Sequence, residues 1–131
     1  MLLGGPMVSI VTPDQWDAPI CFTGMAKRGI TLGHAGLVAI PKNADWNAIL
    51  RHLLTFMRDE SCGKCVPCRM GSLRAHEMAK AGLNNANLPQ FKRIMALMKD
   101  ASLCAFGRET PGPVVTVLEK FGDRIFTEVR S

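Results

Sequence analysis

The spacing of apolar residues divides the chain into two stretches that meet near residue 43. In the first stretch, the runs VSIV at residues 8–11 and GLVAI at residues 36–40 have the length of buried strands, and a proline follows each within two residues. Glycines cluster between the runs, at Gly24, Gly29, Gly33 and Gly36. Such density is typical of turns or close backbone approaches. Residues 1–42 are therefore predicted to form short strands and turns.

From residue 43 onward, the apolar positions recur with the period of an α-helix. Steps of three and four residues join Trp46, Ile49, Leu50, Leu53, Leu54 and Met57. Asn43 or Asp45 could cap the start of this helix, because either side chain can accept a hydrogen bond from a free backbone N–H. The pattern predicts an amphipathic helix whose apolar stripe faces a core.

Three more helices are predicted: one covers residues 71–80, one begins near Pro89 and one begins at Pro113. Gly82 is a candidate stop for the first of them, and Asn87 is a candidate cap for the second. Their expected inward-facing residues are Leu73, Met78 and Ala79 in the first, Phe91, Ile94, Met95 and Met98 in the second, and Val114, Val117, Leu118 and Phe121 in the third. Four helices with short connections predict a small bundle.

These patterns predict an α+β fold, in which a strand-rich segment at residues 1–42 precedes a four-helix domain at residues 43–131. The chain contains eight methionines. Several lie on the predicted apolar faces, where a flexible thioether fills core space: Met57, Met78, Met95 and Met98. The methionines are therefore interpreted as core residues rather than as a soft-metal site.

Composition and charge narrow the class of protein. The chain has 131 residues, 47% hydrophobic and 21% charged, which fits one soluble domain or a small domain with an appendage. No apolar run approaches the roughly 20 residues of a membrane-spanning helix. The N-terminus lacks the basic lead-in of a signal peptide, so the expected location is the cytoplasm. The net charge of +5 is spread along the chain, which argues against nucleic-acid binding.

Candidate chemistry is concentrated in the cysteines. Three of the five fall in ESCGKCVPCRMGS as Cys62, Cys65 and Cys68, a CxxCxxC spacing that suits a metal better than disulfides. Thiolates spaced this way can bind neighbouring corners of a cubane iron–sulfur cluster, and the fourth corner then needs a remote cysteine. Cys104 is the candidate, because it follows the third predicted helix, where the chain can return to the loop. Zinc is the rival, although four-cysteine zinc sites usually present two separated CxxC pairs.

Residues beside these cysteines could support the site. Gly63 permits a tight backbone turn. Lys64 and Arg69 would place positive charge next to a cluster that four thiolates make negative, favouring both ionised thiols and the reduced state. Either cation could equally be an ordinary solvated side chain.

The other potential ligands are predicted to be structural. Cys21 is isolated among apolar neighbours and is expected to be a small buried residue. The three histidines show no ligand spacing and are expected on the surface or in packing: His34, His52 and His76. No residue is predicted to be catalytic.

The segment ESCGKCVPCRMGS, followed by SLCAFG around Cys104, resembles the C-terminal region of the NADH-binding flavoprotein subunit of respiratory complex I, and of related formate dehydrogenase and bidirectional hydrogenase subunits. The resemblance implies a four-helix domain binding one 4Fe-4S cluster through Cys62, Cys65, Cys68 and Cys104. Upstream, LLGGPM and GMAKRGITLGHAGLVAIP are similar to the later half of the family's soluble-ligand-binding β-grasp (SLBB) domain. A partial β-grasp lobe is thus implied at residues 1–42, although His34-Ala35 stands where the family commonly has small residues.

The family's glycine-rich domain for flavin and NADH has no counterpart in this sequence. The resemblance therefore implies a chain that binds neither cofactor alone. It would work as an obligate subunit beside redox chains that carry a flavin or an iron–sulfur centre. An incomplete β-grasp lobe is expected to leave strand edges and apolar surface for a partner to cover.

The sequence is compatible with three functions of different classes. The first is an electron-transfer subunit of a complex resembling NADH dehydrogenase, formate dehydrogenase or hydrogenase, in which one cluster relays single electrons and the polypeptide tunes its potential. The alternative is a structural or docking module, whose 4Fe-4S or zinc site only stabilises the fold and the assembly. A zinc-held domain with affinity for nucleic acid is a third hypothesis, resting on the net charge.

Overall fold

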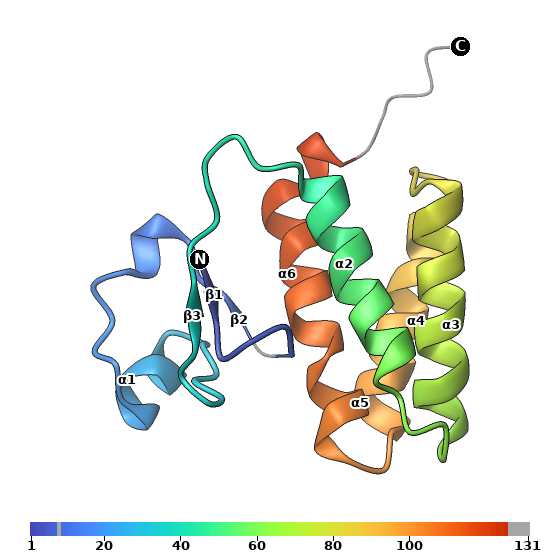
Figure 1. Cartoon of the computed structure of the whole chain (residues 1–131), viewed down its shortest axis with the longest axis horizontal. Coiled ribbons are helices and arrows are strands. Elements are labelled where there is room, and N and C mark those ends of the chain that lie inside the picture. Colours follow the sequence, from blue (N-terminus) through green and yellow to red (C-terminus); the bar gives the residue numbers. More distant parts are fainter. Residues whose placement is uncertain (8, 126–131) are drawn as a thin grey trace.

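The computed structural model describes residues 1–7 and 9–125, in which a small three-stranded sheet lies beside a larger group of helices (Figure 1). The strands are β1 (Leu2–Leu3), β2 (Ser9–Ile10) and β3 (Leu37–Val38). Their order is β2-β1-β3, and both pairings are antiparallel, with Leu2 opposite Ile10 on one side and Val38 on the other. The described chain is mostly helical with one small sheet.

The predicted strands are present in shortened form. β2 covers two of the residues expected at 8–11, where Val8 lies outside the described residues, and β3 covers two of those expected at 36–40. β1 was not predicted, because its Leu-Leu pair is too short to show an alternating pattern.

Residues 1–42 also contain helical structure, so the prediction of strands and turns alone was wrong. A 3-10 turn at Pro13–Gln15 precedes α1 (Phe22–Lys27). α1 begins after Cys21, whose sulfur accepts a hydrogen bond from the backbone N–H of Gly24 at 3.3 Å. A small core of their own holds these elements together, formed by Leu3, Val11, Ala18, Met25, Ile30 and Leu32. We call this part of the chain, residues 1–42, the N-terminal lobe.

The helix predicted from residue 43 is confirmed as α2 (Trp46–Asp59). Of the two candidate caps, Asp45 is the one used: its carboxylate accepts hydrogen bonds from the N–H groups of Asn47 and Ala48 at 2.8 and 3.1 Å. The expected apolar stripe is buried, apart from a partly exposed Ile49. The period of the sequence therefore placed both the helix and its inward face.

The next helix, α3 (Val66–Ala81), begins earlier than the predicted residue 71. Its buried face consists of small residues, Cys68, Gly71, Ser72 and Ala75. Leu73 was predicted to face inward and is instead 36% exposed, so that prediction was wrong. The small side chains let α3 approach its neighbour closely, and a leucine on that face would not fit. Met78 and Ala79 are partly buried against the core, as expected.

Beyond α3 come α4 (Leu88–Ala101), the short α5 (Ala105–Glu109) and α6 (Pro111–Phe121). Pro89 lies in the first turn of α4, as predicted. Asn87 occupies the N-cap position but makes no cap bond; its side chain instead donates to the Gly82 carbonyl oxygen at 2.9 Å. α5 was not predicted, and it adds a helix that the expectation of four helices did not contain.

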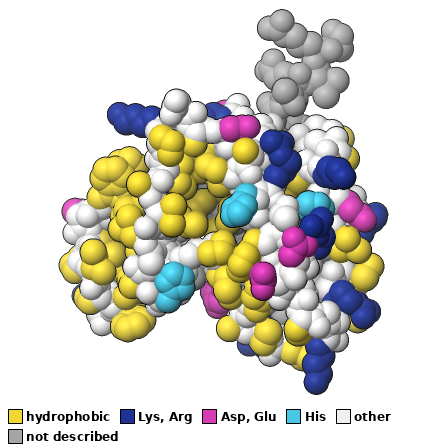
Figure 2. All heavy atoms as spheres, viewed as in Figure 1, with side chains coloured by type: hydrophobic (Ala, Val, Ile, Leu, Met, Phe, Trp, Pro, Cys, Tyr) yellow, Lys and Arg dark blue, Asp and Glu magenta, His cyan; other side chains and the backbone are white. Residues whose placement is uncertain are grey.

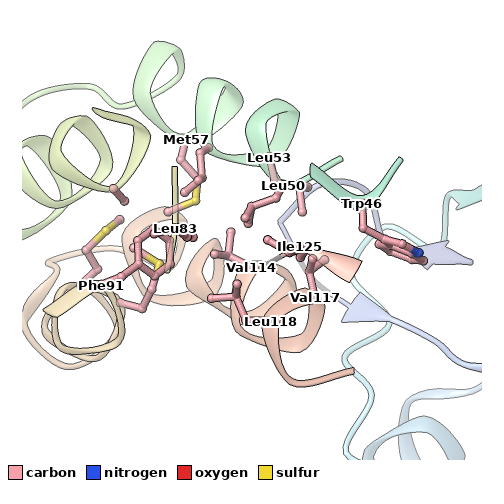
Figure 3. Close-up of a cluster of buried hydrophobic side chains, with 14 of the residues drawn as sticks. Trp46, Leu50, Leu53, Met57, Leu83, Phe91, Val114, Val117, Leu118 and Ile125 are labelled. Atoms are coloured by element: carbon pink, nitrogen blue, oxygen red, sulfur yellow. The ribbon is translucent and has the colours of Figure 1, made fainter. Parts of the chain in front are cut away.

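The main core lies between α2, α3, α4 and α6 and extends to Ile10 of β2. Figure 3 shows the leucines of α2 pointing toward the valines of α6. At one end of this core, the rings of Trp46 and Phe121 stack with centroids 3.5 Å apart and planes 8° apart. The predicted inward residues of the third and fourth helices are buried here, except the partly exposed Ile94 and Phe121. α6 therefore joins the helices to the sheet.

A groove of about 230 Å³ lies between the N-terminal lobe and the helices, and Trp46 and Phe121 contribute to its wall. Figure 2 shows apolar side chains over much of the lobe, at the left, while lysines and arginines gather mainly over the helices, at the right. Within the described residues, none of the helices has the length and apolarity to cross a membrane.

Candidate metal centre

Helix α3 begins inside the cysteine motif and fixes two of its thiols. Cys65 is the N-cap residue, with an extended backbone at φ −98° and ψ 137°, and Pro67 lies in the first turn, where its missing N–H costs nothing. Cys68 follows on the buried face of the helix and is only 5% exposed. The third cysteine therefore stands on a helix, whereas a continuous loop was expected.

The preceding loop turns at Gly63, whose φ of +74° lies in the left-handed region that favours glycine. Its N–H donates to the Ser61 hydroxyl oxygen at 3.4 Å, and the same oxygen lies 3.4 Å from the Cys68 sulfur. This turn carries Cys62 back toward the start of α3.

Cys104 reaches the same place from the other side. α4 packs against α3 and ends at Ala101, and Cys104 is the N-cap residue of α5 three residues later. The backbone N–H of Leu103 lies close enough to the Cys65 sulfur to lower the pKa of its thiol, so the segment before α5 lies against the start of α3. The predicted return of the chain to the cysteine loop is thus seen in the structure.

The four predicted ligands line a single cavity of about 170 Å³. Cys62 and Cys104 are exposed, Cys65 is half-buried and Cys68 is buried. The other lining residues are Glu60, Ser61, Lys64 and Phe106. Among residues 1–7 and 9–125, no three cysteine, histidine or carboxylate side chains converge closely enough to hold a single metal ion. The four thiols reach this cavity from the loop before α3, from the start of α3 and from the start of α5.

The surroundings shift the pKa values of two thiols in opposite directions. The N–H groups of Leu103 and then Cys68 lower the pKa of Cys65, with a smaller contribution from the Ser102 hydroxyl. Burial raises the pKa of Cys68, and repulsion from the other three thiolates adds to the effect, while the Ser61 hydroxyl opposes it. The surroundings of Cys65 thus favour its thiolate, whereas the burial of Cys68 makes negative charge costly there.

The flanking residues singled out in the sequence lie at different distances from the cavity. Lys64 is part of its wall. Arg69 is exposed and outside the wall, and its Cδ lies 3.8 Å from where a Cβ on Gly63 would stand. Sequence reasoning missed Phe106 and Ser102, because neither an aromatic ring nor a buried hydroxyl is marked by cysteine spacing. The motif SLC before the remote cysteine was the signal available for Ser102.

The remaining candidate ligands lie elsewhere. Cys21 is exposed in the N-terminal lobe, so its predicted burial was wrong; its sulfur caps α1 instead. His34 is exposed and accepts a hydrogen bond from the Gly36 N–H at 3.0 Å, and His52 is exposed on α2. His76 is half-buried between α2 and α3, in agreement with a packing role.

Comparison with known proteins assigns the chain to a family. Residues 48–127 match the family described as the NADH-ubiquinone oxidoreductase-F iron-sulfur binding region, and the chain belongs to that family. The cavity of four cysteines lies within the matched residues. The chain is therefore an iron–sulfur-binding region of the kind found in electron-transporting oxidoreductases.

Its relatives are subunits of larger oxidoreductases. The chain is 29% identical over 124 residues to the HndC subunit of the NADP-reducing hydrogenase of Solidesulfovibrio fructosivorans, covering 92% of this chain and 25% of the relative. It is 26% identical over 130 residues to a subunit of the NADH-quinone oxidoreductase of Mycobacterium bovis, covering 96% of this chain and 29% of the relative. The chain thus spans about a quarter of the length of these proteins.

The fold has counterparts among solved structures. A chain of the NAD+-reducing [NiFe]-hydrogenase in the H2-reduced state superposes with a TM-score of 0.81 at 24% identity, over 95% of this chain and 22% of the other. The air-oxidized state of the same kind of enzyme gives a TM-score of 0.79 at 25% identity. The likeness covers the N-terminal lobe as well as the helices, because nearly the whole chain is superposed.

Proposed function

We propose that Cys62, Cys65, Cys68 and Cys104 bind one 4Fe-4S cluster and that the chain relays single electrons within a multisubunit oxidoreductase. The observation that carries the proposal is the cavity that all four thiols line. Its 170 Å³ would hold several waters at about 30 Å³ each in the liquid, so it is roomy enough for a multi-atom group. A zinc ion would need its sulfurs at about 2.3 Å from one point. Thiols spread around a cavity suit a cluster that offers a separate iron to each.

The chain's own residues prepare this cavity for the cluster, which would supply the group that gains and loses the electron. The start of α3 favours negative charge at Cys65, because free helix N–H groups and the helix dipole point toward it. Gly63 shapes the loop, and Lys64 adds positive charge at the cavity wall. Arg69 lies over the Gly63 turn and would contribute charge from outside. Burial of Cys68 limits the access of water from the core side.

The N-terminal lobe is proposed to be part of a β-grasp domain, divided from the iron–sulfur domain between residues 42 and 43. Its edge strand β3 exposes both of its residues, Leu37 and Val38, at 54% each. Other large apolar side chains of the lobe are also exposed, namely Trp16, Ile20 and Phe22. A partner chain that carries a flavin or an iron–sulfur centre would cover this surface and exchange electrons with the cluster.

The proposal assigns no flavin, NADH or catalytic residue to this chain. It places the protein in the cytoplasm, where a reducing environment keeps thiols free for metal binding.

Electron counting tests the relay. The full chain, prepared without oxygen, is titrated with dithionite and reoxidised over several cycles while visible absorbance and the EPR spectrum are followed. We expect about one electron per cluster to be taken up, and the starting spectrum to return. A bound cluster that neither accepts nor returns an electron would leave only the structural function, and a colourless zinc protein would refute both the cluster and the relay.

A further inference from the structure

One buried hydroxyl beside the cysteine cavity lacks a partner in the protein. Ser102 is 1% exposed, and its Oγ makes no hydrogen bond. A buried donor without an acceptor is costly, and buried hydroxyls are normally bonded. Ser72, an equally buried serine on α3, shows the usual arrangement, since its hydroxyl donates to the Arg69 carbonyl oxygen at 3.3 Å.

The backbone on both sides of this hydroxyl is held in place. The Ser102 N–H donates to the Met98 carbonyl oxygen at 3.1 Å, at the end of α4. The Ser102 carbonyl oxygen in turn accepts a bond from Nε of Arg108 at 2.8 Å. The backbone of Ser102 is therefore fixed, and its buried side chain has little access to water.

Packing against Gly107 holds the hydroxyl near Cys68. A Cβ on Gly107 would lie 2.4 Å from the Ser102 oxygen and 3.0 Å from the Cys68 Cβ, so only glycine leaves room for the serine here. The same hydroxyl also contributes to lowering the pKa of the Cys65 thiol, so it lies near that sulfur, although the protein offers it no hydrogen-bond partner. Cys104 follows two residues later in the chain. An unpaired donor is therefore fixed close to Cys65 and Cys68, two of the proposed ligands.

We propose that the Ser102 hydroxyl donates a hydrogen bond to sulfur of the bound cluster, at Cys65 or an adjacent sulfide, and thereby raises the reduction potential. This inference rests on the proposed function, because it needs the cluster. Reduction adds one electron and no atom, so the hydroxyl keeps its proton throughout. The added negative charge falls largely on the sulfurs and strengthens the O–H···S bond. The reduced form is therefore stabilised more than the oxidised form, and Ser102 acts as a positioning residue for that charge.

The test compares Ser102→Ala with Ser72→Ala, two identical changes at equally buried serines. The midpoint potential is measured by an anaerobic redox titration followed by EPR. For Ser102→Ala we expect the ratio of reduced to oxidised cluster at a fixed potential to fall three- to tenfold, which is about 28 to 59 mV for one electron. Ser72→Ala should stay within threefold of the unmodified chain, because its hydroxyl is already bonded to the helix. A Ser102→Ala shift below threefold, or an equal shift in both variants, would overturn the inference.

A second measurement separates tuning from a purely structural role. In the cluster-free chain, Ser102→Ala removes an unsatisfied hydroxyl and should leave the urea midpoint unchanged or higher. A lower midpoint, or a Ser102→Ala chain that folds but holds no cluster, would make Ser102 a structural residue and overturn the inference. If the unmodified chain itself holds no iron and sulfide, the proposed function fails instead.

Discussion

Gly71 of α3 lies directly against Met98 of α4. A Cβ at position 71 would stand 2.4 Å from the Met98 Cγ and 2.7 Å from its Sδ. The pair therefore sets how closely the two helices approach. Since Cys68 belongs to α3 and Cys104 follows α4, this separation also sets how the cysteines face each other across the cavity.

We expect Gly71→Ala to destabilise the chain despite the better helix propensity of alanine. Propensity would contribute about 1 kcal/mol, while overpacking costs about 1 to 3 kcal/mol. Met98→Ala alone should cost about 2 to 5 kcal/mol, because it leaves a cavity in the core. The double variant should lose less free energy of unfolding than the two single variants lose together, by at least about 1 kcal/mol, because the new methyl group fills part of that cavity. Urea denaturation of the four chains measures this coupling, and simple additivity would contradict the contact.

The stacked rings of Trp46 and Phe121 join the start of α2 to the end of α6. Phe121→Ala should lower the free energy of unfolding by about 2 to 4 kcal/mol, from lost burial and stacking. Phe22→Ala is the control, because that ring is 75% exposed, and it should change stability by less than about 0.5 kcal/mol. Equal effects of the two substitutions in urea unfolding would show that the stack contributes no stability.

At Gly63, the effect of backbone strain on a substitution can be separated from the effect of limited space for a side chain. A Cβ there would meet only the Arg69 Cδ, at 3.8 Å, so a side chain has room, and the positive φ alone opposes it. Gly63→Ala should cost about 1 to 2 kcal/mol, and the cluster should be lost faster to an iron chelator. Gly63→Asn should lose the cluster more slowly than Gly63→Ala, because asparagine tolerates the left-handed region better. Chelator rates in the reverse order would contradict a conformational role for the glycine.

His76 links α2 to α3 as a neutral ring. Arg58 Nη1 lies 2.7 Å from its Nε2, and a guanidinium can only donate, so Nε2 accepts; Thr55 Oγ1 lies 3.4 Å from Nδ1. Burial, followed by the charges of Arg58 and Lys80, lowers the pKa of His76. The folded state therefore binds this proton less tightly than the unfolded state. The resulting stabilisation is complete above the ordinary histidine value of about 6.5 and is lost as the pH falls through the lower folded value.

Urea unfolding at pH 7.5 and at pH 5 tests this sign. We expect the stability lost between the two values to be smaller in His76→Gln than in the unmodified chain. His52→Gln, at an exposed histidine on the neighbouring helix α2, should lose as much as the unmodified chain. Parallel losses in all three chains would show that His76 does not titrate differently in the folded state.

How far the sequence predicts the structure depends on the residue types involved. α2 could be placed because large apolar residues face the core at helical steps and Asp45 caps the start. The inward face of α3 could not, because it consists of small residues such as Gly71 and Ala75, and a search for large apolar residues selects the exposed Leu73. Its early start was hidden by Pro67, which fits a loop as well as a first turn.

Some features of the site could likewise be predicted from the sequence, and others could not. The spacing of the first three cysteines, together with the predicted position of Cys104 after the third helix, was sufficient to predict that the four thiols lie close together. The structure places them around one cavity. The unpaired hydroxyl of Ser102 depends on contacts between α4, α5 and α3 that no local pattern contains. Tertiary packing alone reveals such a residue.

Chemical analysis of iron, acid-labile sulfide and zinc in the anaerobically prepared chain shows whether the four cysteines hold a 4Fe-4S cluster. We expect about four irons and about four sulfides per chain, with little zinc. Cys104→Ser should lower this content sharply, whereas Cys21→Ser, at an exposed thiol away from the cavity, should leave it unchanged. One zinc per chain without iron or sulfide, or full iron content in Cys104→Ser, would contradict the account.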